Sequence, residues 1–304
     1  MLCAWRWVCK QTPMNEQSTV KAALWMAGSI ACFLTMSVAG RTVTAALDVF
    51  QVMEMRSIIG LVMLSPLIYR AGGLKAMRTR RPALHVYRNV LHYAGQFGWL
   101  MAVGMIPLAE MVAIEFTTPI WTAVWAVLFL REALNRNKLL AMAFGLIGVL
   151  MIVRPGGDAV QTGHLIMVAA AMAFGITITI TRSLAQTEST VRIIFWMLVI
   201  QSAIGLAPAI YVWQPPELAI WPPLLVVAFT GTFSHFCMAR ALSYAEATVV
   251  SPMDFMRLPL TALIGWFIYS EQLDAISVAG AVLILSGNVF NLRRRSTAPT
   301  SVTG

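Results

Sequence analysis

Charged side chains are scarce in this sequence. They make up 12% of its 304 residues, whereas a soluble globular domain carries about 25%. Hydrophobic residues make up 59%, and the mean hydropathy is +0.74. So little charge excludes an ordinary water-soluble domain, and so much apolar residue excludes a disordered chain. A polytopic helical membrane protein remains, and at about 30 residues per span and loop the length predicts about ten spans.

Cysteines are also few, and the common catalytic motifs are missing. The four cysteines form neither a CxxC pair nor a zinc-binding spacing, so we expect small apolar fillers rather than disulfides or a metal site. No Walker A, HExxH or GxSxG motif occurs. We therefore predict no cofactor and no ATP-driven pump, so the energy for any transport would come from ion coupling or exchange. The cysteines are Cys3, Cys9, Cys32 and Cys237.

Long apolar runs fill most of the chain, and their number agrees with the estimate of ten. A polar, basic tail at 1–21 precedes them, and a basic tail rich in serine and threonine at 293–304 follows. The runs are 22–40, 49–68, 84–106, 111–130, 139–153, 163–181, 193–212, 224–242, 249–269 and 276–292.

Basic residues concentrate on one side of these spans. If the N-terminus lies inside, the outer loops hold only Arg41 and Arg154, while Arg56 and Arg257 fall within spans. Lysine and arginine collect in cytoplasmic loops, so we predict a multi-pass protein of the cell inner membrane with both termini in the cytoplasm. The net charge of +9 then reflects orientation rather than binding of nucleic acid.

The two halves of the sequence match when one is shifted by 139 positions. Glu132 meets Glu271, each just after a span, and Glu115 meets Asp254, each inside one. Because each half would hold five spans, an odd number, the halves would cross the membrane in opposite directions, as in inverted-repeat transporters. We predict repeats at 22–155 and 161–292. Further identities are Phe97 with Phe236, Ala102 with Ala241, Thr122 with Thr261, and Leu134 with Leu273.

Two short motifs carry a family resemblance. Pro107-Leu108-Ala109-Glu110, followed by Ile114-Glu115-Phe116-Thr117-Thr118-Pro119 and Leu130-Arg131-Glu132, resembles the fourth-helix region of EamA-domain proteins. Ser251-Pro252-Met253-Asp254-Phe255, Gly265 and Ser270-Glu271 form its counterpart, and Arg56 also fits the family pattern.

The resemblance is to the drug/metabolite transporter superfamily, and it covers about 22–292. It implies ten helices in two inverted five-helix repeats around a central cavity open to alternating sides. Members of the superfamily carry amino acids, vitamins, nucleotide-like metabolites and drugs. The Ile-Glu-Phe and Pro-Met-Asp-Phe variants are similar to bacterial members linked to uptake of riboflavin or S-adenosylmethionine.

Five charged residues fall inside expected spans: Glu54, Arg56, Glu115, Asp254 and Arg257. A centred charge costs roughly 2.5–3.5 kcal/mol, so we expect pairs or water-lined positions. Asp254 and Arg257 are three apart, so they can form an ion pair that is either structural or part of a binding site. Glu115 lacks a partner on its own helix, and we expect Arg56 to supply it. Glu54 is two residues from Arg56 and faces elsewhere, as an interfacial acid or an intramembrane one.

Glu115 and Asp254 are expected at different depths. Glu115 falls in the outer half of its span and Asp254 in the inner half, so we predict that they serve gates or coupling on opposite sides. Pro119 and Pro259 lie within the same two spans, and each frees a backbone carbonyl.

Weaker candidates come from the third and eighth spans and from small residues. His92, Gln96 and Trp99 share one face of a helix, and His235 lies in the equivalent span. Each lines a cavity or, alternatively, makes structural hydrogen bonds or packs against lipid. Small residues four apart predict that 139–153 and 276–292 take part in close helix packing. The same small residues could form the contact of a homodimer. They are Ala141 with Gly145, and Ser277 with Ala281.

The sequence thus predicts an all-α polytopic membrane protein with ten transmembrane helices in two inverted five-helix repeats. We expect a secondary active transporter that moves a small organic metabolite by alternating access, either proton-coupled or as an exchanger. A membrane-embedded lipid-modifying enzyme and a non-catalytic partner subunit are the alternatives. The main candidates for substrate binding or coupling are Arg56, Glu115, Asp254 and Arg257, followed by His92, Gln96, Trp99 and His235.

Overall fold

The computed structural model describes residues 18–130, 136–153, 162–185, 187–244, 253–272 and 274–293. In these residues the regular structure is entirely helical. The first half contains α1 (Thr19–Ala46), α2 (Val49–Arg70), the short η2 (Leu74–Met77), α3 (Pro82–Met105), α4 (Leu108–Glu115), α5 (Thr118–Leu130) and α6 (Arg136–Val153). The second half contains α7 (Thr162–Ala185), α8 (Thr190–Tyr211), η3 (Leu218–Ile220), α9 (Trp221–Tyr244), α11 (Arg257–Tyr269) and α12 (Ala275–Arg293).

Each expected apolar run is mostly helical where the structure describes it, and the runs 111–130 and 249–269 are each interrupted by a two-residue turn. Within the described residues, five segments are long and apolar enough to cross a membrane by length and composition: Thr19–Ala46, Val49–Arg70, Thr162–Thr181, Thr190–Tyr211 and Leu218–Met238. Ala143–Ile152, Arg257–Tyr269 and Ala275–Gly287 are shorter apolar helices. The chain is therefore a polytopic membrane protein, and ten crossings stay a prediction.

Polar side chains fix the starts of several helices. Ser18 accepts a hydrogen bond from the backbone N–H of Lys21 at the start of α1, and Ser189 does the same for Arg192 at the start of α8. Asp48 accepts from the N–H of Phe50, and only two residues separate the end of α1 at Ala46 from the start of α2. Such caps satisfy N–H groups that the helix leaves unpaired, and they keep α1 and α2 joined by a tight turn.

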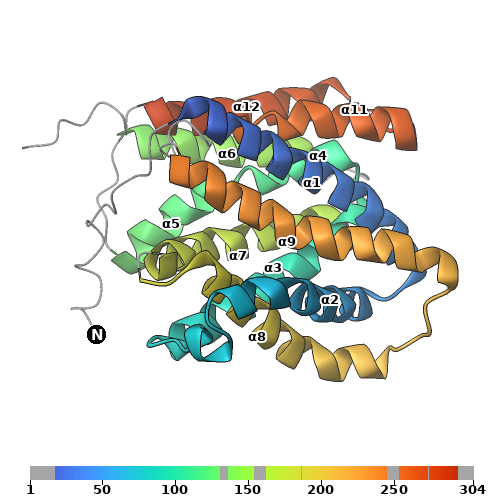
Figure 1. Ribbon diagram of the computed structural model, residues 1–304. Helices are drawn as coiled ribbons and strands as arrows, with labels where there is room; N and C mark the ends of the chain where they lie inside the picture. The colour runs from blue at the N-terminus through green and yellow to red at the C-terminus, as the bar shows by residue number, and fades with distance from the viewer. Residues whose placement is uncertain are drawn as a thin grey trace, which may run out of the picture.

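The helices pair across the two halves of the chain. The first helix, α1, lies against α9, and α3 lies against α7, while α2 packs on α8 and α6 on α12 (Figure 1). If α1, α2, α3 and α6 correspond in order to α7, α8, α9 and α12, then the α1–α9 and α7–α3 contacts exchange, and the other two pairs join equivalent helices. This is the contact pattern of a two-fold relation between the halves.

The expected fourth span is broken rather than continuous. Its first part, α4, ends at Glu115, and α5 begins at Thr118. Pro119 has no N–H to donate to the carbonyl of Glu115, and it is tolerated in the first turn of α5. The hydroxyl of Thr118 donates to that freed carbonyl instead, at 2.6 Å.

The ninth span has a matching break. Met253 and Asp254 are helical, the next two residues form a turn, and α11 begins at Arg257. Pro259 follows in the first turn of α11, as Pro119 does in α5. Each break therefore comes directly after one of the two acids that the repeat aligns.

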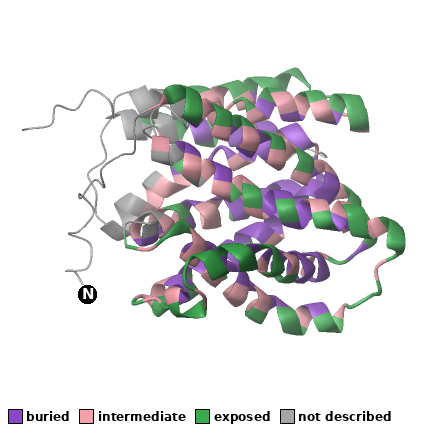
Figure 2. Ribbon diagram, viewed as in Figure 1, coloured by how far each residue is buried: buried purple, intermediate pink, exposed green. Residues whose placement is uncertain are grey.

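Apolar side chains cover much of the outside, and many polar ones are buried. Trp266 and Phe267 on α11 are 58% and 73% exposed, whereas Gln51, Asn89 and Gln201 are fully buried. Buried residues follow the inward faces of the helices and exposed residues the periphery (Figure 2). Large exposed apolar side chains on helices, with polar groups satisfied inside, are typical of a surface made for lipid.

Small residues bring α6 and α12 together, as the spacing predicts, but within one chain. The closest approach is at Gly148 and Gly280, where a methyl group built on Gly148 would lie 2.6 Å from the carbonyl oxygen of Gly280. Gly145 instead faces Ile120 of α5, and the side chain of Ala141 lies outside the described part of the structure. Ser277 is 4% exposed and donates to Glu110 at 2.9 Å. A homodimer stays a prediction.

Candidate functional site

Two carboxylates and one guanidinium form a cluster between the halves of the chain. Arg257 Nη1 lies 3.1 Å from Glu115 Oε1, and Arg257 Nη2 lies 2.9 Å from Asp254 Oδ2. The three side chains are 12–18% exposed. The predicted ion pair between Asp254 and Arg257 is therefore confirmed. With both acids ionised, the cluster carries one more negative charge than positive charge.

The expected contact between Glu115 and Arg56 is wrong. The partner of Glu115 does come from another helix, but it is Arg257 at the start of α11. The Glu115 side chain lies at the end of α4, which packs on α11, whereas Arg56 on α2 binds amide groups. Spacing along the sequence assigns Arg257 one partner, Asp254. A guanidinium group has five N–H donors, however, so Arg257 can bind a second acid as well.

The expected separation of the two acids in depth is also wrong, because both bind the same guanidinium group. Glu115 comes at the last residue of α4, and Asp254 comes just before the turn that precedes α11. The predicted depths come from counting residues along a span that is assumed to be one continuous helix. The two breaks instead bring the acids of the two halves together at one point, where they act as a unit.

Aromatic rings enclose this cluster. Trp99 Nε1 donates to Glu115 Oε2 at 2.8 Å. The guanidinium carbon of Arg257 lies 4.2 Å from the ring centre of Phe33 and 4.9 Å from that of Phe116. Cation–π contacts of this kind compensate a cation for part of its lost hydration. Helices α1, α3, α4 and α11 thus all contribute to the cluster.

A second polar group surrounds Arg56 on α2. Arg56 Nη2 donates to Gln96 Oε1 at 2.5 Å and to Gln201 Oε1 at 3.4 Å. Gln201 Nε2 and His92 Nδ1 are 2.9 Å apart. Arg56 is 7% exposed, and no carboxylate pairs with it in the described residues. It is a buried cation held by neutral partners, so its charge is available to an anionic group.

His235 adjoins this group from α9. Its ring centre lies 5.9 Å from that of His92. His92 is buried, whereas His235 is exposed. The structure thus places His235 beside His92, so these two candidates belong to one group.

One face of α3 joins the two polar groups. His92 contacts Gln201, Gln96 contacts Arg56, and Trp99 contacts Glu115. The predicted common face of these three residues is therefore confirmed. From His92 to Trp99 the helix rises about 10 Å, at 1.5 Å per residue. This polar strip, formed by His92, Gln96 and Trp99, contacts an unpaired cation at Gln96 and, about 4.5 Å further along the helix at Trp99, a cluster with excess negative charge.

Sequence reasoning missed two partners on α8. Gln201 links Arg56 to His92, and Ser202 donates to Glu54. Both lie in the apolar run 193–212, where a lone glutamine is itself a signal, because an unpaired amide is costly inside a membrane. Glu54 is 2% exposed, so protein encloses its carboxyl group, and the choice between an interfacial and an intramembrane position stays a prediction.

A second ion pair also escaped the sequence analysis. Arg41 near the end of α1 pairs with Glu271, which follows α11. Arg41 also donates to the carbonyls of Val103 and Ile106, each at 2.7 Å, and Glu271 accepts from the N–H of Leu108 at 2.9 Å. This network ties α1 and the α11–α12 connection to the turn between α3 and α4. Glu132, the repeat counterpart of Glu271, lies outside the described residues.

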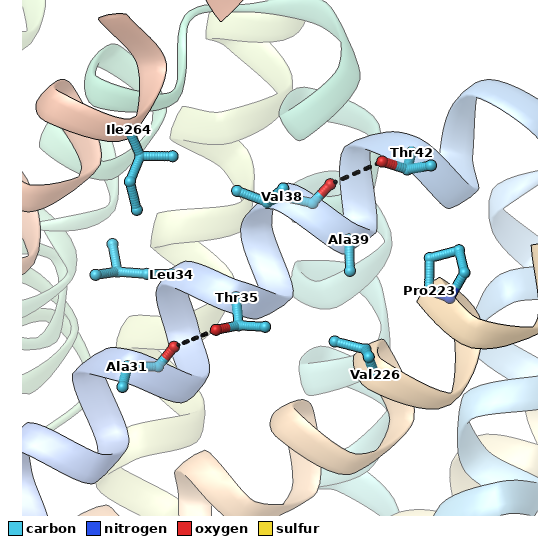
Figure 3. Close-up of a pocket in the computed structure, with 9 residues that line it drawn as sticks. All are labelled: Ala31, Leu34, Thr35, Val38, Ala39, Thr42, Pro223, Val226 and Ile264. Carbon is cyan, nitrogen blue, oxygen red and sulfur yellow. Dashed lines mark hydrogen bonds between the residues drawn. The ribbon is translucent and has the colours of Figure 1, made fainter. Parts of the chain in front are cut away.

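A surface groove lies elsewhere and is apolar. It runs along α1 between α9 and α11, where Leu34, Val226 and Ile264 contribute to its lining (Figure 3). Its two threonines donate to their own helix, Thr35 to the carbonyl of Ala31 and Thr42 to that of Val38. The lining side chains therefore leave no free polar donor, and we place the site at the polar strip instead.

Comparison with known proteins identifies the family. Residues 20–154 and 161–293 each match the EamA-like transporter family. The chain therefore belongs to this family and contains two repeats of it. Proteins of the family are transporters, so the chain is a multi-pass membrane protein of a transporter family and not an enzyme.

Curated relatives carry several substrate names. A riboflavin transporter of Brucella anthropi is 32% identical over 79% of this chain and 86% of its own length. An S-adenosylmethionine uptake transporter of Rickettsia prowazekii is 26% identical over 91% and 95%. The pseudopaline exporter CntI of Pseudomonas aeruginosa is 26% identical over 83% and 89%. The relatives thus include both uptake and export proteins.

A solved crystal structure has the same fold. It superposes with a TM-score of 0.63 over 92% of this chain and 100% of its own, at 18% identity. At that identity the likeness concerns the fold alone.

Proposed function

We propose that this protein is a secondary transporter that moves a small organic metabolite across the inner membrane by alternating access. The repeats 22–155 and 161–292 would each hold five spans in opposite orientation, which makes ten. The exchange of the α1–α9 and α7–α3 contacts supports this arrangement. The distribution of lysine and arginine supports cytoplasmic positions for the tails at 1–21 and 293–304.

The bridge that Arg257 makes between Glu115 and Asp254 carries the proposal. Inverted-repeat transporters bind their cargo where discontinuous helices of the two repeats meet. Here the acids come from equivalent positions in the two repeats, each beside a break in its span. Rocking one repeat against the other must change this cluster, so a ligand bound there would sense which side is open.

The chemistry of the polar strip favours a ligand with two kinds of polar end. The excess negative charge at Glu115 and Asp254 suits a cationic or donor group, and Arg56 suits an acidic or carbonyl group. Trp99 and Phe33 offer rings on which a planar system can pack. Riboflavin and S-adenosylmethionine, which name the relatives, are the first substrates to test. Transport would be coupled to protons or run as exchange.

Flux through the purified protein in liposomes tests this function. We expect uptake of radiolabelled riboflavin or S-adenosylmethionine above that of protein-free liposomes, and faster counterflow when the unlabelled compound is inside. Glu115→Gln should abolish the flux, whereas Glu217→Gln, at an exposed acid before η3, should leave it unchanged. If a broad metabolite library produces no flux in either direction, the proposed function is wrong.

A further inference from the structure

Among the acids that the structure describes, Glu54 alone is buried, at 2% exposure. It also lacks a cationic partner among these residues. Five other acids contact a base at close range: Glu115 and Asp254 bind Arg257, Glu271 binds Arg41, Glu188 contacts His85, and Glu110 contacts His164. Glu54 instead accepts one hydrogen bond, from the hydroxyl of Ser202 to Oε1.

The second oxygen of Glu54 faces a space shared with Tyr93. Glu54 Oε2 and Tyr93 Oη are both buried, and neither has a hydrogen-bond partner in the described structure. A methyl group built on Gly205 of α8 would lie 2.9 Å from each of these oxygens. Glycine at 205 is therefore what allows a carboxyl group of α2 and a phenol of α3 to approach α8 at one place.

No nearby charge neutralises the carboxylate. Tyr93 is the titratable group that faces it from α3, and α8 contributes Ser202 and Gly205, which are uncharged. On α2 itself, Arg56 binds Gln96 and Gln201 instead. Asp48, at the start of the helix, accepts from the N–H of Phe50 and would only repel a second negative charge.

An ionised carboxylate in such a position is costly, and a buried acid without a counterion takes up a proton instead. We propose that Glu54 is a proton-binding site, separate from the Glu115–Arg257–Asp254 cluster, and that it carries the proton that drives transport. The first part stands on the geometry of Glu54 alone, and the second rests on the proposed function. The ligand of this site is H⁺, held on Oε2 while Oε1 accepts from Ser202.

The position of Glu54 between α2 and α8 explains how the proton could be released. These helices belong to different repeats, so a movement of one repeat against the other separates Glu54 and Tyr93 from Gly205 of α8 and admits water. The proton then passes from Oε2 to a water molecule, and the carboxylate becomes ionised. The water that enters hydrates the carboxylate and so stabilises the charged form.

Carbodiimide labelling tests the protonation without any substrate. Dicyclohexylcarbodiimide reacts with protonated carboxyl groups in apolar surroundings, and peptide mass spectrometry locates the adduct. Near neutral pH we expect the adduct on Glu54 and not on Glu115 or Asp254, with labelling that falls as the pH rises. Ser202→Ala, which removes the donor that favours the ionised form, should move this fall to higher pH. Absence of an adduct on Glu54 throughout the range from weakly acidic to neutral pH would overturn the proposal.

Liposome transport tests the coupling, with riboflavin and S-adenosylmethionine as probes. Glu54→Gln should lose accumulation driven by a pH gradient but keep counterflow, which needs no net proton movement. Glu115→Gln should lose both. If Glu54→Gln accumulates substrate as well as the wild type, Glu54 does not carry the driving proton. Lack of counterflow in the wild type would contradict the proposed function instead, and the labelling result would still decide the protonation of Glu54.

Discussion

Glu115 and Asp254 bind two nitrogens of one guanidinium group, although they lie 139 positions apart in the sequence. Arg257 is therefore the single cation for two largely buried acids. Each acid comes from a different repeat, and each lies beside a break in its span. The cluster is thus a contact between the repeats as well as a candidate binding site, and its parts can be separated by mutation.

Removal of the central cation should destabilise the protein more than removal of either acid. Arg257→Gln leaves Glu115 and Asp254 facing each other, and loss of one partner from a buried ion pair costs about 3–5 kcal/mol. We expect a clearly lower midpoint of thermal unfolding in detergent. Glu115→Gln and Asp254→Asn, added to Arg257→Gln, should restore part of it, because no uncompensated charge is left. Arg80→Gln, at an exposed position, is the control, and equal stability of Arg257→Gln and wild type would contradict this account.

Trp99→Phe tests the hydrogen bond that orients Glu115. The substitution keeps an aromatic ring beside Phe33 but removes the N–H that donates to Glu115 Oε2. A hydrogen bond to a charged group contributes about 1.5–3 kcal/mol, so we expect the KM for transport to rise about tenfold or more, with a smaller change in maximal rate. Trp266→Phe, at a ring that is 58% exposed, should change neither quantity. An unaltered KM in Trp99→Phe would mean that this donor plays no part in binding.

Local features of this protein are predictable from its sequence, and contacts between helices largely are not. Long apolar runs mark the helices, since only helices satisfy the backbone inside a membrane, and spacing by three predicts the Asp254–Arg257 pair. The common face of His92, Gln96 and Trp99 follows from the same periodicity. The partner of Glu115 depends instead on how α4 packs against α11, which no spacing along the chain encodes.

The breaks in the two spans explain the other errors. Pro119 and Pro259 indicate that hydrogen bonds are lost, but not on which side of the proline the helix ends. A depth assigned to Glu115 or Asp254 by counting along an unbroken helix is therefore wrong. Gln201 could have been recognised as a candidate, because it is an amide in an otherwise apolar run, but its role as a link between Arg56 and His92 requires the fold.

The contact between α6 and α12 should tolerate no added side chain at its closest point. A methyl group on Gly148 would lie 2.6 Å from the backbone oxygen of Gly280 and from Ile284, and a backbone atom cannot move aside as a side chain can. We expect Gly148→Ala to lower the free energy of unfolding by about 1–3 kcal/mol, measured by denaturation in mixed detergent. Gly104→Ala is the control, because its nearest neighbour is 3.5 Å away at Thr44, and it should be neutral or slightly stabilising. Equal effects at the two glycines would show that the α6–α12 approach is looser than the structure has it.

Exchange of the two charges of the Arg41–Glu271 pair should restore only part of the stability and transport that each single substitution removes. Arg41→Glu and Glu271→Arg each place like charges together, so both should lower stability and transport. In the double variant the opposite charges face each other again. The exchanged residues, however, cannot donate to the carbonyls of Val103 and Ile106 or accept from the N–H of Leu108, as the native pair does.

The double variant should therefore recover part of the loss and not all of it. Residues in direct contact show interaction energies of about 0.5–3 kcal/mol, and a double-mutant cycle on thermal stability measures this value. If the effects of the two single substitutions simply add, the ion pair contributes nothing beyond its separate backbone contacts. A full recovery would instead mean that those backbone contacts are dispensable and that charge alone joins α1 to the α11–α12 connection.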